Sequence, residues 1–356
     1  MMENMPDEML RVVDANLNRL GEGLRVLEEL ARLVLDDAAL TQQLKNLRHS
    51  LVRVDRGMQV RLLGARDAAA DVGQEMTVPG EGMLRGVADT ALANARRAQE
   101  SLRVLEEAAK VRGLGLDPEQ FQKARFALYT IEKALIGKIT RRDKTPRLRG
   151  LYVVLDTAAL GRRDPVTVAG QAVRGGARII QLRDKSSGRK GLLAVAREMQ
   201  GLCAEKGVLF IVNDYLDIAL AVGADGLHVG QEDLPVAEAR RLLPIDKILG
   251  GSARTVAEAI AARDDGADYI GVGAMYPTPS KPEAVVVGPA RLEEIRKAVD
   301  LPLVAIGGIN KDNLGQVMAA GADAVAVISA VLGAADVEAA SRRLAERMGH
   351  EPAKSG

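Results

Sequence analysis

The sequence has few of the residues on which nucleophilic enzymes and metal-cluster proteins depend. Cysteine occurs once, as Cys203, which excludes an internal disulfide and a cysteine-based metal cluster. Tryptophan is absent and aromatic residues make up 2% of the chain, so stacking platforms for single-stranded nucleic acid are not expected. Lys and Arg number 49 against 48 Asp and Glu, and the net charge of +1 gives no bulk attraction to nucleic acid or to an anionic membrane.

Long apolar runs are also missing. No apolar stretch reaches the roughly 18 residues that a membrane-spanning helix needs. The N-terminus lacks the basic and then apolar pattern of a secretory signal. We therefore expect a soluble, cytoplasmic protein with neither a nucleic-acid nor a membrane partner. A length of 356 residues and a hydrophobic content of 47% predict two domains with substantial cores.

The hydrophobic period changes near residue 145. Before this point apolar residues recur with helical spacing, and after it β-type and helical patterns alternate. The segment between the two patterns is basic and contains Pro146. We therefore predict an all-α domain over residues 1–140, a basic linker over residues 141–149 and an α/β domain over residues 150–356.

The helical domain contains an internal duplication. Residues 16–29 return 78 residues later as residues 94–107, with nine of the fourteen positions identical. A second helical run follows each copy, near residues 44–54 and 121–131. This pattern predicts a duplicated helical hairpin that packs as a four-helix unit. The charged segment 66–75 joins the halves, either as a cover for a site or as a plain connection.

Helical spacing sorts the polar residues of the repeat into two groups. Glu22, Arg25 and Glu29 fall opposite the apolar stripe, where a solvated ladder of ion pairs is expected. Four polar residues, two from each copy, lie closer to the edge of the stripe: Asn16, Arg19, Asn94 and Arg97. These four line a polar cleft if the copies pack about a pseudo-twofold axis; otherwise they cap the interface between the copies.

Eight apolar β-type runs alternate with helical patterns after residue 150. The runs are residues 151–155, 179–182, 209–212, 226–229, 248–250, 269–272, 303–306 and 324–328. This alternation predicts a closed (β/α)8, or TIM, barrel. A doubly wound open sheet is the alternative, but it would normally carry a glycine-rich fingerprint after its first strand, and Leu155-Asp156-Thr157 has none.

Polar signatures follow these strands, and the carboxyl ends of barrel strands meet at one rim. Arg183 and Lys185 together suit a polyanion, although alone such cations form surface salt bridges. Asp214 and Asp233 follow neighbouring strands and suit Mg²⁺, while Asp233 could equally cap a helix. The loop that carries Lys281 is either a lid over the mouth or a plain surface loop. Together, these cations and carboxylates at one rim predict a site for pyrophosphate, a divalent metal and a phosphate.

These signatures resemble those of thiamine phosphate synthase (thiamine-phosphate pyrophosphorylase), over residues 150–347. The matching series is Gln181-Leu-Arg-Asp-Lys185, Asn213-Asp214, Gly226-Leu-His-Val-Gly-Gln-Glu-Asp233, Gly250-Gly-Ser252, Pro277-Thr-Pro-Ser-Lys281, Gly307-Gly-Ile309 and Ser329. The resemblance implies a Mg²⁺-dependent transferase that joins hydroxymethylpyrimidine diphosphate to thiazole phosphate and releases pyrophosphate. Its partners would be these two phosphorylated small molecules.

The resemblance also implies a role for each matching residue. The diphosphate would be held by Arg183, Lys185, Asn213, Ser252 and Lys281, and of these Arg183, Lys185, Ser252 and Lys281 would be the catalytic residues. Gln181 would contact the pyrimidine, and Asp214 and Asp233 would bind Mg²⁺. The thiazole phosphate would be received by Thr278, Ser280, Gly308, Ile328 and Ser329. No general base is required, because the attacking thiazole nitrogen carries no proton.

One segment departs from the family pattern. The sixth strand ends as Gly271-Val-Gly-Ala-Met-Tyr276, where the family often has Gly-Pro-Val-Phe, so the path of the following loop is in question. A related barrel, thiazole tautomerase, is the alternative function. That relative lacks the full diphosphate set, which this sequence keeps, and the synthase is therefore favoured.

The helical domain resembles a module that precedes this synthase in some bacteria and has been proposed as an alternative hydroxymethylpyrimidine phosphate kinase. The resemblance is carried by the repeat over residues 16–29 and 94–107. The sequence contains no Gly-x-x-x-x-Gly-Lys-Ser/Thr phosphate loop. A pathway enzyme, a module that binds pyrimidine phosphate and a dimerisation scaffold all stay open. The sequence leaves the oligomeric state open as well, a homodimer included.

Overall fold

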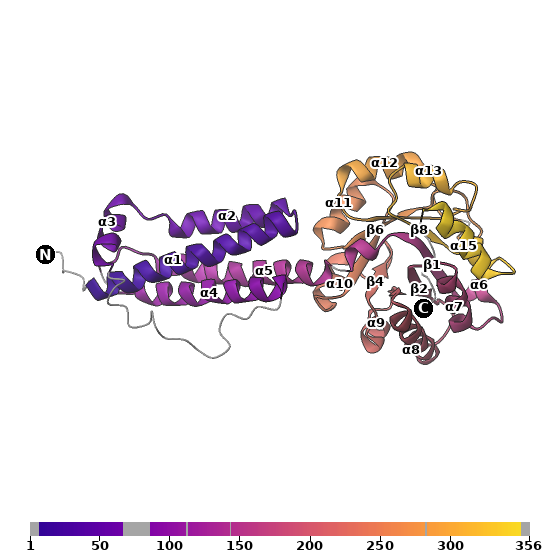
Figure 1. Ribbon diagram of the computed structural model, residues 1–356, viewed down its shortest axis with the longest axis horizontal. Helices are drawn as coiled ribbons and strands as arrows, with labels where there is room; N and C mark the ends of the chain where they lie inside the picture. The colour runs from indigo at the N-terminus through magenta and orange to yellow at the C-terminus, as the bar shows by residue number, and fades with distance from the viewer. Residues whose placement is uncertain (1–6, 67–85, 112, 143, 282, 350–356) are drawn as a thin grey trace. The chain divides into compact units, whose positions relative to one another are not determined.

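The computed structural model describes residues 7–66, 86–111, 113–142, 144–281 and 283–349. Of the segment 66–75, proposed above as a cover or a connection, residues 67–75 lie outside the described residues. The chain divides into two compact units, Met1–Arg142 and Asp143–Gly356. The first unit is helical and the second is an α/β barrel (Figure 1).

The helical unit contains both copies of the predicted hairpin. Its α-helices are α1 (Asp7–Glu29), α2 (Ala38–Val52), α3 (Arg56–Ala65), α4 (Val87–Ala108) and α5 (Pro118–Arg141), and a π-helical turn at Leu30–Val34 extends α1. Aspartates begin three of these helices: the side chains of Asp37, Asp55 and Asp117 accept backbone N–H groups of α2, α3 and α5. The short helix α3 was not predicted.

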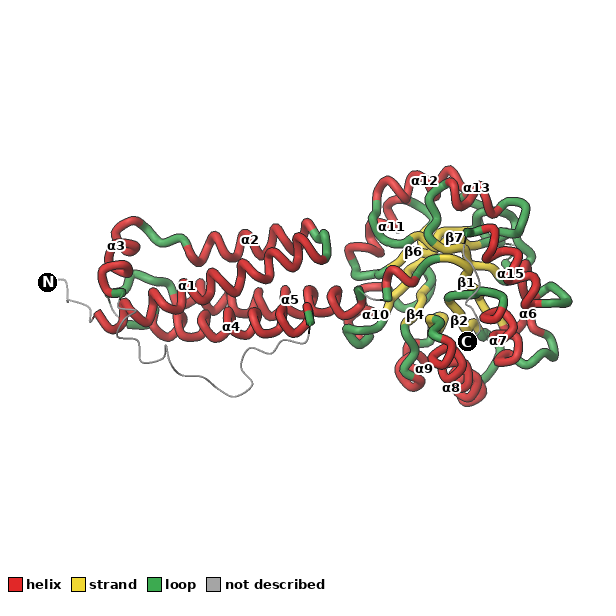
Figure 2. The backbone as a smooth tube through the Cα atoms, in the orientation of Figure 1, coloured by secondary structure: helices red, strands yellow, loops and turns green. Residues whose placement is uncertain are grey.

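The core of this unit lies between the equivalent helices α1 and α4, with α2 and α5 beside them (Figure 2). Leu20 and Leu24 of α1 and Leu102 and Leu105 of α4 are fully buried, as their helical spacing predicts. Gly23 allows close approach, because a Cβ atom there would lie 3.0 Å from the carbonyl oxygen of Asn94. The duplication therefore places two copies of one helix against each other.

The second unit is a closed barrel of eight parallel strands in chain order, which confirms the predicted fold. The strands are β1 (Gly150–Asp156), β2 (Ile179–Arg183), β3 (Leu209–Asn213), β4 (Gly226–Val229), β5 (Ile248–Ala253), β6 (Tyr269–Gly273), β7 (Leu303–Ile306) and β8 (Ala324–Val327). The helices around them are α6 (Thr157–Leu160), α7 (Pro165–Arg174), α8 (Arg189–Lys206), α9 (Leu216–Val222), α10 (Val236–Leu242), α11 (Val256–Asp264), α12 (Gly288–Ala298), α13 (Leu314–Ala319), α14 (Ser329–Leu332) and α15 (Val337–Arg347).

The barrel has two apolar layers because neighbouring side chains of a strand point to opposite faces. Outward-facing residues such as Val153, Phe210 and Ile270 pack under the helices. Inward-facing residues such as Ile211, Ile248 and Val304 fill the interior. This inner layer leaves the carboxyl ends of the strands as the open rim.

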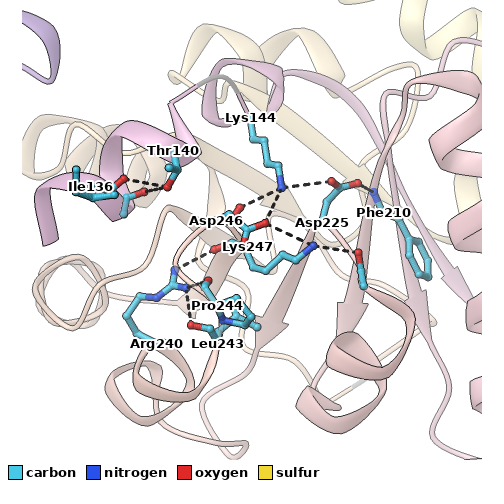
Figure 3. A network of polar contacts seen from close by, with 12 residues as sticks. Ile136, Thr140, Lys144, Phe210, Asp225, Arg240, Leu243, Pro244, Asp246 and Lys247 are labelled. Carbon is cyan, nitrogen blue, oxygen red and sulfur yellow. Dashed lines mark hydrogen bonds and ion pairs between the residues drawn. The ribbon is translucent and has the colours of Figure 1, made fainter. Parts of the chain in front are cut away.

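The segment that leads into β1, residues 144–148, is held against the barrel by polar contacts of Lys144 (Figure 3). A turn of 3-10 helix spans Thr145–Arg147, and the fully buried Leu148 belongs to the inner apolar layer. Lys144 donates from Nζ to the carbonyl oxygen of Asp246 at 3.0 Å and lies 3.6 Å from the carboxylate of Asp225. Residues 144–148 are therefore part of the barrel unit rather than a free connection.

Candidate active site

A cavity of about 760 Å³ opens at the carboxyl ends of the barrel strands. Its lining includes all thirteen residues that the sequence analysis predicted for the barrel site: Gln181, Arg183, Lys185, Asn213, Asp214, Asp233, Ser252, Thr278, Ser280, Lys281, Gly308, Ile328 and Ser329. They come from strand ends and loops that are far apart in the sequence. The closed parallel barrel brings them together because every strand ends at the same rim.

The end of β2 presents a buried amide and a guanidinium group. Gln181 is 5% exposed, and its Nε2 donates to the hydroxyl of Tyr152 at 2.7 Å. Arg183 forms an ion pair with Asp156, the last residue of β1. Asp156 was not among the predicted site residues, although its position at a strand end was a signal that could have identified it. The ion pair fixes the guanidinium group beside the cavity.

Asp184 fixes the turn that follows β2. Its Oδ1 accepts the backbone N–H groups of Ser186 at 2.9 Å and Ser187 at 2.8 Å, and the hydroxyl of Ser186 at 3.1 Å. Burial opposes ionisation, but the hydrogen bonds from Ser187 and Ser186 outweigh it and lower the pKa of Asp184 to about 2. This buried carboxylate therefore sets the backbone between Arg183 and Lys185.

Lys185 pairs with both aspartates that were predicted to bind a metal. Its ammonium group forms an ion pair with Asp214 and lies 3.9 Å from Oδ1 of Asp233. Burial and the neighbouring carboxylate of Asp233 raise the pKa of Asp214 to about 6, although Lys185 acts in the opposite direction. Burial also opposes the charge of Lys185, but its hydrogen bond to Asp214 raises the pKa of the lysine. One cation thus compensates two adjacent carboxylates.

The backbone around these carboxylates is specialised. Asp214 has a φ of 61°, a left-handed conformation that aspartate tolerates better than most residues. Oδ2 of Asp233 accepts the backbone N–H of Gly230 at 3.0 Å. Helix α10 begins after Pro235 without a side-chain cap. The alternative that Asp233 caps this helix is therefore wrong, and its carboxylate faces the cavity instead.

A chain of hydrogen bonds crosses the floor of the cavity. Ser252 Oγ lies 3.0 Å from Nε2 of His228, and Nδ1 of His228 lies 3.0 Å from the hydroxyl of Tyr269. That hydroxyl lies 3.1 Å from the hydroxyl of Tyr152, which accepts from Gln181. Burial lowers the pKa of His228 to about 4, so its ring is neutral near pH 7. This network connects the amide of β2 to the hydroxyl of β5.

Two glycines make room for this network inside the barrel. A Cβ atom at Gly250 would lie 2.1 Å from the ring of Tyr269, and one at Gly271 would lie 2.9 Å from the ring of His228. Neither tyrosine was among the predicted site residues. Their inward-facing positions on strands, in a chain with only five tyrosines, were a usable signal.

The loop after β6 forms one wall of the mouth. Thr278, Ser280 and Lys281 line the cavity from this loop, and the peptide N–H of Ser280 donates to Oγ1 of Thr278 at 3.4 Å. Gly308 has a φ of 67°, and a Cβ atom there would lie 2.6 Å from the carbonyl oxygen of Pro277. The loop therefore packs directly on the backbone after β7.

The unusual Ala274-Met275 step is accommodated within the fold. Both side chains are buried, at 7% and 1% exposure. Ala274 exchanges backbone hydrogen bonds with Val285 and Val287 at 3.2 and 2.8 Å, and the N–H of Met275 donates to the carbonyl oxygen of Ile306 at 2.9 Å. These bonds return the loop to the barrel after Lys281.

Four polar residues of the helical repeat were predicted either to line a cleft or to cap the interface between the two copies. Asn16 and Asn94 are each 8% exposed and donate from Nδ2 to carbonyl oxygens of their own helices, at Val12 (2.8 Å) and Thr90 (2.9 Å). Arg19 and Arg97 are exposed. The amides thus satisfy helix carbonyls, and a cleft formed by all four residues remains a prediction.

The repeat instead contains two matching buried carboxylates that sequence reasoning missed. Glu28 pairs with Arg25 at 3.0 Å and with Arg48 at 2.9 Å. Glu106 pairs with Arg103 at 2.9 Å and with Arg125 at 3.0 Å. The predicted ladder is realised as a pair between Arg25 and Glu29, while Glu22 is exposed. The two clusters each join the helices of one hairpin.

No group of three or more His, Cys, Asp or Glu side chains that could hold a metal exists among the described residues. Within the same residues, no helix is long and apolar enough to cross a membrane. A metal at this site would therefore need ligands beyond the two carboxylates of the rim.

The fold and the cavity define a (β/α)8-barrel enzyme with a polar site suited to phosphorylated ligands. Residues 151–331 match the thiamine monophosphate synthase family, and residues 11–134 match the ThiD2 family. A thiamine-phosphate synthase of Thermosynechococcus vestitus is 40% identical over 339 residues, covering 95% of this chain and 94% of that protein. The chain belongs to the thiamine-phosphate synthase family.

Two shorter relatives each match somewhat more than half of this chain. A thiamine-phosphate synthase of Methanospirillum hungatei is 50% identical over 202 residues, 56% of this chain and 98% of that protein. The structure of a thiamine phosphate pyrophosphorylase from Pyrococcus furiosus has a TM-score of 0.54 and 39% identity, and covers 57% of this chain and 97% of that one. The chain is therefore a transferase of thiamine biosynthesis that performs the family's condensation, which favours the synthase over the tautomerase.

Proposed function

We propose that the barrel cavity binds hydroxymethylpyrimidine diphosphate and thiazole phosphate side by side. Pyrophosphate leaves first, in a dissociative step, and the thiazole nitrogen then attacks the cationic methylene. The observation that carries this proposal is the gathering of three cations and two carboxylates in one cavity: Arg183, Lys185, Lys281, Asp214 and Asp233. A diphosphate needs such cations, and the carboxylates suit a metal that bridges phosphate oxygens.

The residues present fit Mg²⁺. Asp214 and Asp233 offer oxygen ligands, and the ammonium group of Lys185 already lies against both, so the position favours a cation. Two carboxylates suffice because Mg²⁺ commonly takes its other ligands from substrate phosphates and water. When bound, the metal would neutralise negative charge on the leaving pyrophosphate.

The chain's own cations contribute to the same step. Arg183 and Lys281 are placed to bind the oxygens of the diphosphate and to stabilise the charge that grows as the C–O bond breaks. Ser252 and Asn213 offer hydrogen bonds to the same group. Gln181 orients the aminopyrimidine, whose electron-rich ring stabilises the cationic methylene. The thiazole nitrogen attacks this carbon without losing a proton, so the neutral His228 has no proton to remove.

The thiazole phosphate occupies the opposite side of the mouth. The residues proposed to receive it are Thr278, Ser280, Gly308, Ile328 and Ser329, which line the cavity from the β6 loop and the ends of β7 and β8. This placement agrees with the frequent use of the last two strand ends for phosphate in (β/α)8 barrels.

The exposed Lys281 provides the direct test. Lys281→Ala should lower turnover strongly, because one charge that stabilises the leaving group is removed, with little change in the free energy of unfolding. Lys311→Ala, an exposed lysine paired with Asp312, is the matched control and should leave turnover unchanged. Near-normal thiamine phosphate formation by Lys281→Ala would remove this residue from the proposed mechanism.

For the helical unit we propose a role in handling pyrimidine phosphate, supported by the match of residues 11–134 to the ThiD2 family. ADP or phosphate release by residues 1–140 would identify a pathway enzyme. Ligand binding without turnover would identify a binding module. Loss of an oligomer when residues 1–145 are removed would identify a scaffold. Synthase activity retained by residues 146–356 would show that the barrel site is complete.

A further inference from the structure

The contact between Lys185 and the two aspartates has a consequence for metal binding. Lys185 follows β2, Asp214 follows β3 and Asp233 follows β4, so three neighbouring strand ends meet at one point. The side chains of Asp214 and Asp233 are 7% and 28% exposed, whereas that of Lys185 is 47% exposed. The carboxylates are thus held by the fold, and the ammonium group sits on a flexible four-carbon stem.

We propose that Lys185 is an exchangeable occupant of the metal position, which leaves Asp214 and Asp233 only when a diphosphate provides it with another anion. The proposal rests on the proposed metal site and deepens it. In the absence of ligand, Lys185 compensates the two carboxylates. When the diphosphate arrives, the lysine moves onto it and vacates the position for the divalent cation.

The electrostatics require this exchange to be coupled. A divalent cation and an ammonium group repel each other strongly at the short distance that two shared carboxylates impose. A metal that binds alone must break the ion pair between Lys185 and Asp214 and leave the ammonium group without an anion. A diphosphate removes this cost. Metal and diphosphate should therefore each tighten the binding of the other, since coupling between two ligands is reciprocal.

Lys281 distinguishes this exchange from a general effect of charge. It lines the same cavity, and no ion pair joins it to another described residue. Removing its charge lowers the positive potential of the cavity just as removal of Lys185 does. It does not, however, release the carboxylates of Asp214 and Asp233. Lys281→Met is therefore a matched control for Lys185→Met.

The experiment measures binding of Mn²⁺ to the full chain by electron paramagnetic resonance of the free ion, with and without inorganic pyrophosphate and with correction for Mn²⁺ bound by pyrophosphate in solution. Lys185→Met should bind Mn²⁺ alone roughly 5- to 150-fold more tightly than the unaltered chain, the usual range of coupling between ligands. Pyrophosphate should then strengthen Mn²⁺ binding less in Lys185→Met than in the unaltered chain. Lys281→Met, which changes only the general potential of the cavity, should tighten binding of Mn²⁺ alone far less than Lys185→Met does.

Three results would overturn the proposal: unchanged or weaker Mn²⁺ binding by Lys185→Met, an undiminished effect of pyrophosphate in that variant, or equal tightening in Lys281→Met. Lys185→Gln repeats the measurement with a polar side chain should the methionine variant fold poorly. Asp214→Asn should abolish the Mn²⁺ site that pyrophosphate strengthens. If Asp214→Asn leaves this site intact, the metal position itself is wrong, which is a different failure from that of the exchange.

Discussion

Asp156 and Arg183 face each other across the β1–β2 register, and their side chains form an ion pair at the ends of the two strands. Asp156 is 5% exposed, and its Oδ1 also accepts the backbone N–H of Ala158 at 3.0 Å, at the start of α6. The carboxylate is thus fixed from two directions. It holds the guanidinium group in place without lying among the predicted ligand-binding residues.

Asp156→Ala should lower kcat/KM for the pyrimidine diphosphate on the order of tenfold to hundredfold, because a small displacement of a charged group at the reacting centre has effects of this size. Asp156→Asn keeps an oxygen acceptor for Arg183 and should recover part of the loss. Steady-state kinetics with both substrates measure the effect. Glu338→Ala, which removes a surface pair with Arg174, is the control. Wild-type kinetics in Asp156→Ala would show that Arg183 needs no such support.

Asp184 should contribute stability that depends on pH. Its pKa of about 2 lies below the ordinary value of 3.8, so its contribution is fully present above pH 4 and is lost as the pH falls through about 2. Asp184→Ala should therefore reduce the free energy of unfolding by about 2 kcal/mol at pH 7, and the difference should shrink in acid. Urea unfolding at several pH values measures this. Glu346→Ala, at an exposed site on α15, should show no such trend.

The sequence was sufficient to predict the strand positions and the residues that meet at the rim. Alternation of apolar runs with helical patterns identified all eight strands, and closure of the barrel then places Gln181, Asp214 and Lys281 around one cavity regardless of their separation in the chain. Such convergence follows from topology alone. It requires no knowledge of individual side-chain contacts.

Contacts between side chains of different strands could not be predicted in the same way. The pair of Asp156 with Arg183 depends on the β1–β2 register, and the contact of Lys185 with Asp214 depends on the path of a turn. Glu28 lies beside the apolar stripe of α1, and only the packing of α2 against α1 brings Arg48 to it. Local patterns specify which face a residue occupies, but the partner on that face is set by tertiary packing.

His228 should remain neutral throughout the physiological pH range. Burial holds its pKa at about 4, so protonation would occur only well below pH 5. In NMR spectra of the full chain, the ring resonances of His228 should not shift between pH 5.5 and 8. The chain has three histidines, and loss of one set of signals in His228→Gln assigns the resonances. A midpoint near the ordinary value of 6.5 would contradict the neutral hydrogen-bond chain from Ser252 to Tyr269.

The buried carboxylates Glu28 and Glu106 should stabilise the two helical hairpins to a similar extent. Their side chains are 4% and 5% exposed, and each accepts from two arginines. Replacing either glutamate by alanine leaves one largely buried cation, Arg48 or Arg125, without its buried partner, and this loss costs up to about 3 to 5 kcal/mol. Hydrogen exchange measured by mass spectrometry on the full chain should show faster exchange in the helical unit and unchanged exchange in the barrel.

The adjacent glutamates of each copy give matched controls. Glu29 and Glu107 are 30% and 48% exposed and pair with the same arginines, Arg25 and Arg103. Because exposed pairs contribute about 1 kcal/mol or less, Glu29→Ala and Glu107→Ala should leave the exchange pattern nearly unchanged. If Glu28→Ala and Glu29→Ala behave alike, the buried clusters do not stabilise the hairpins. If only one of Glu28→Ala and Glu106→Ala accelerates exchange, the two copies have become energetically unequal despite their matching geometry.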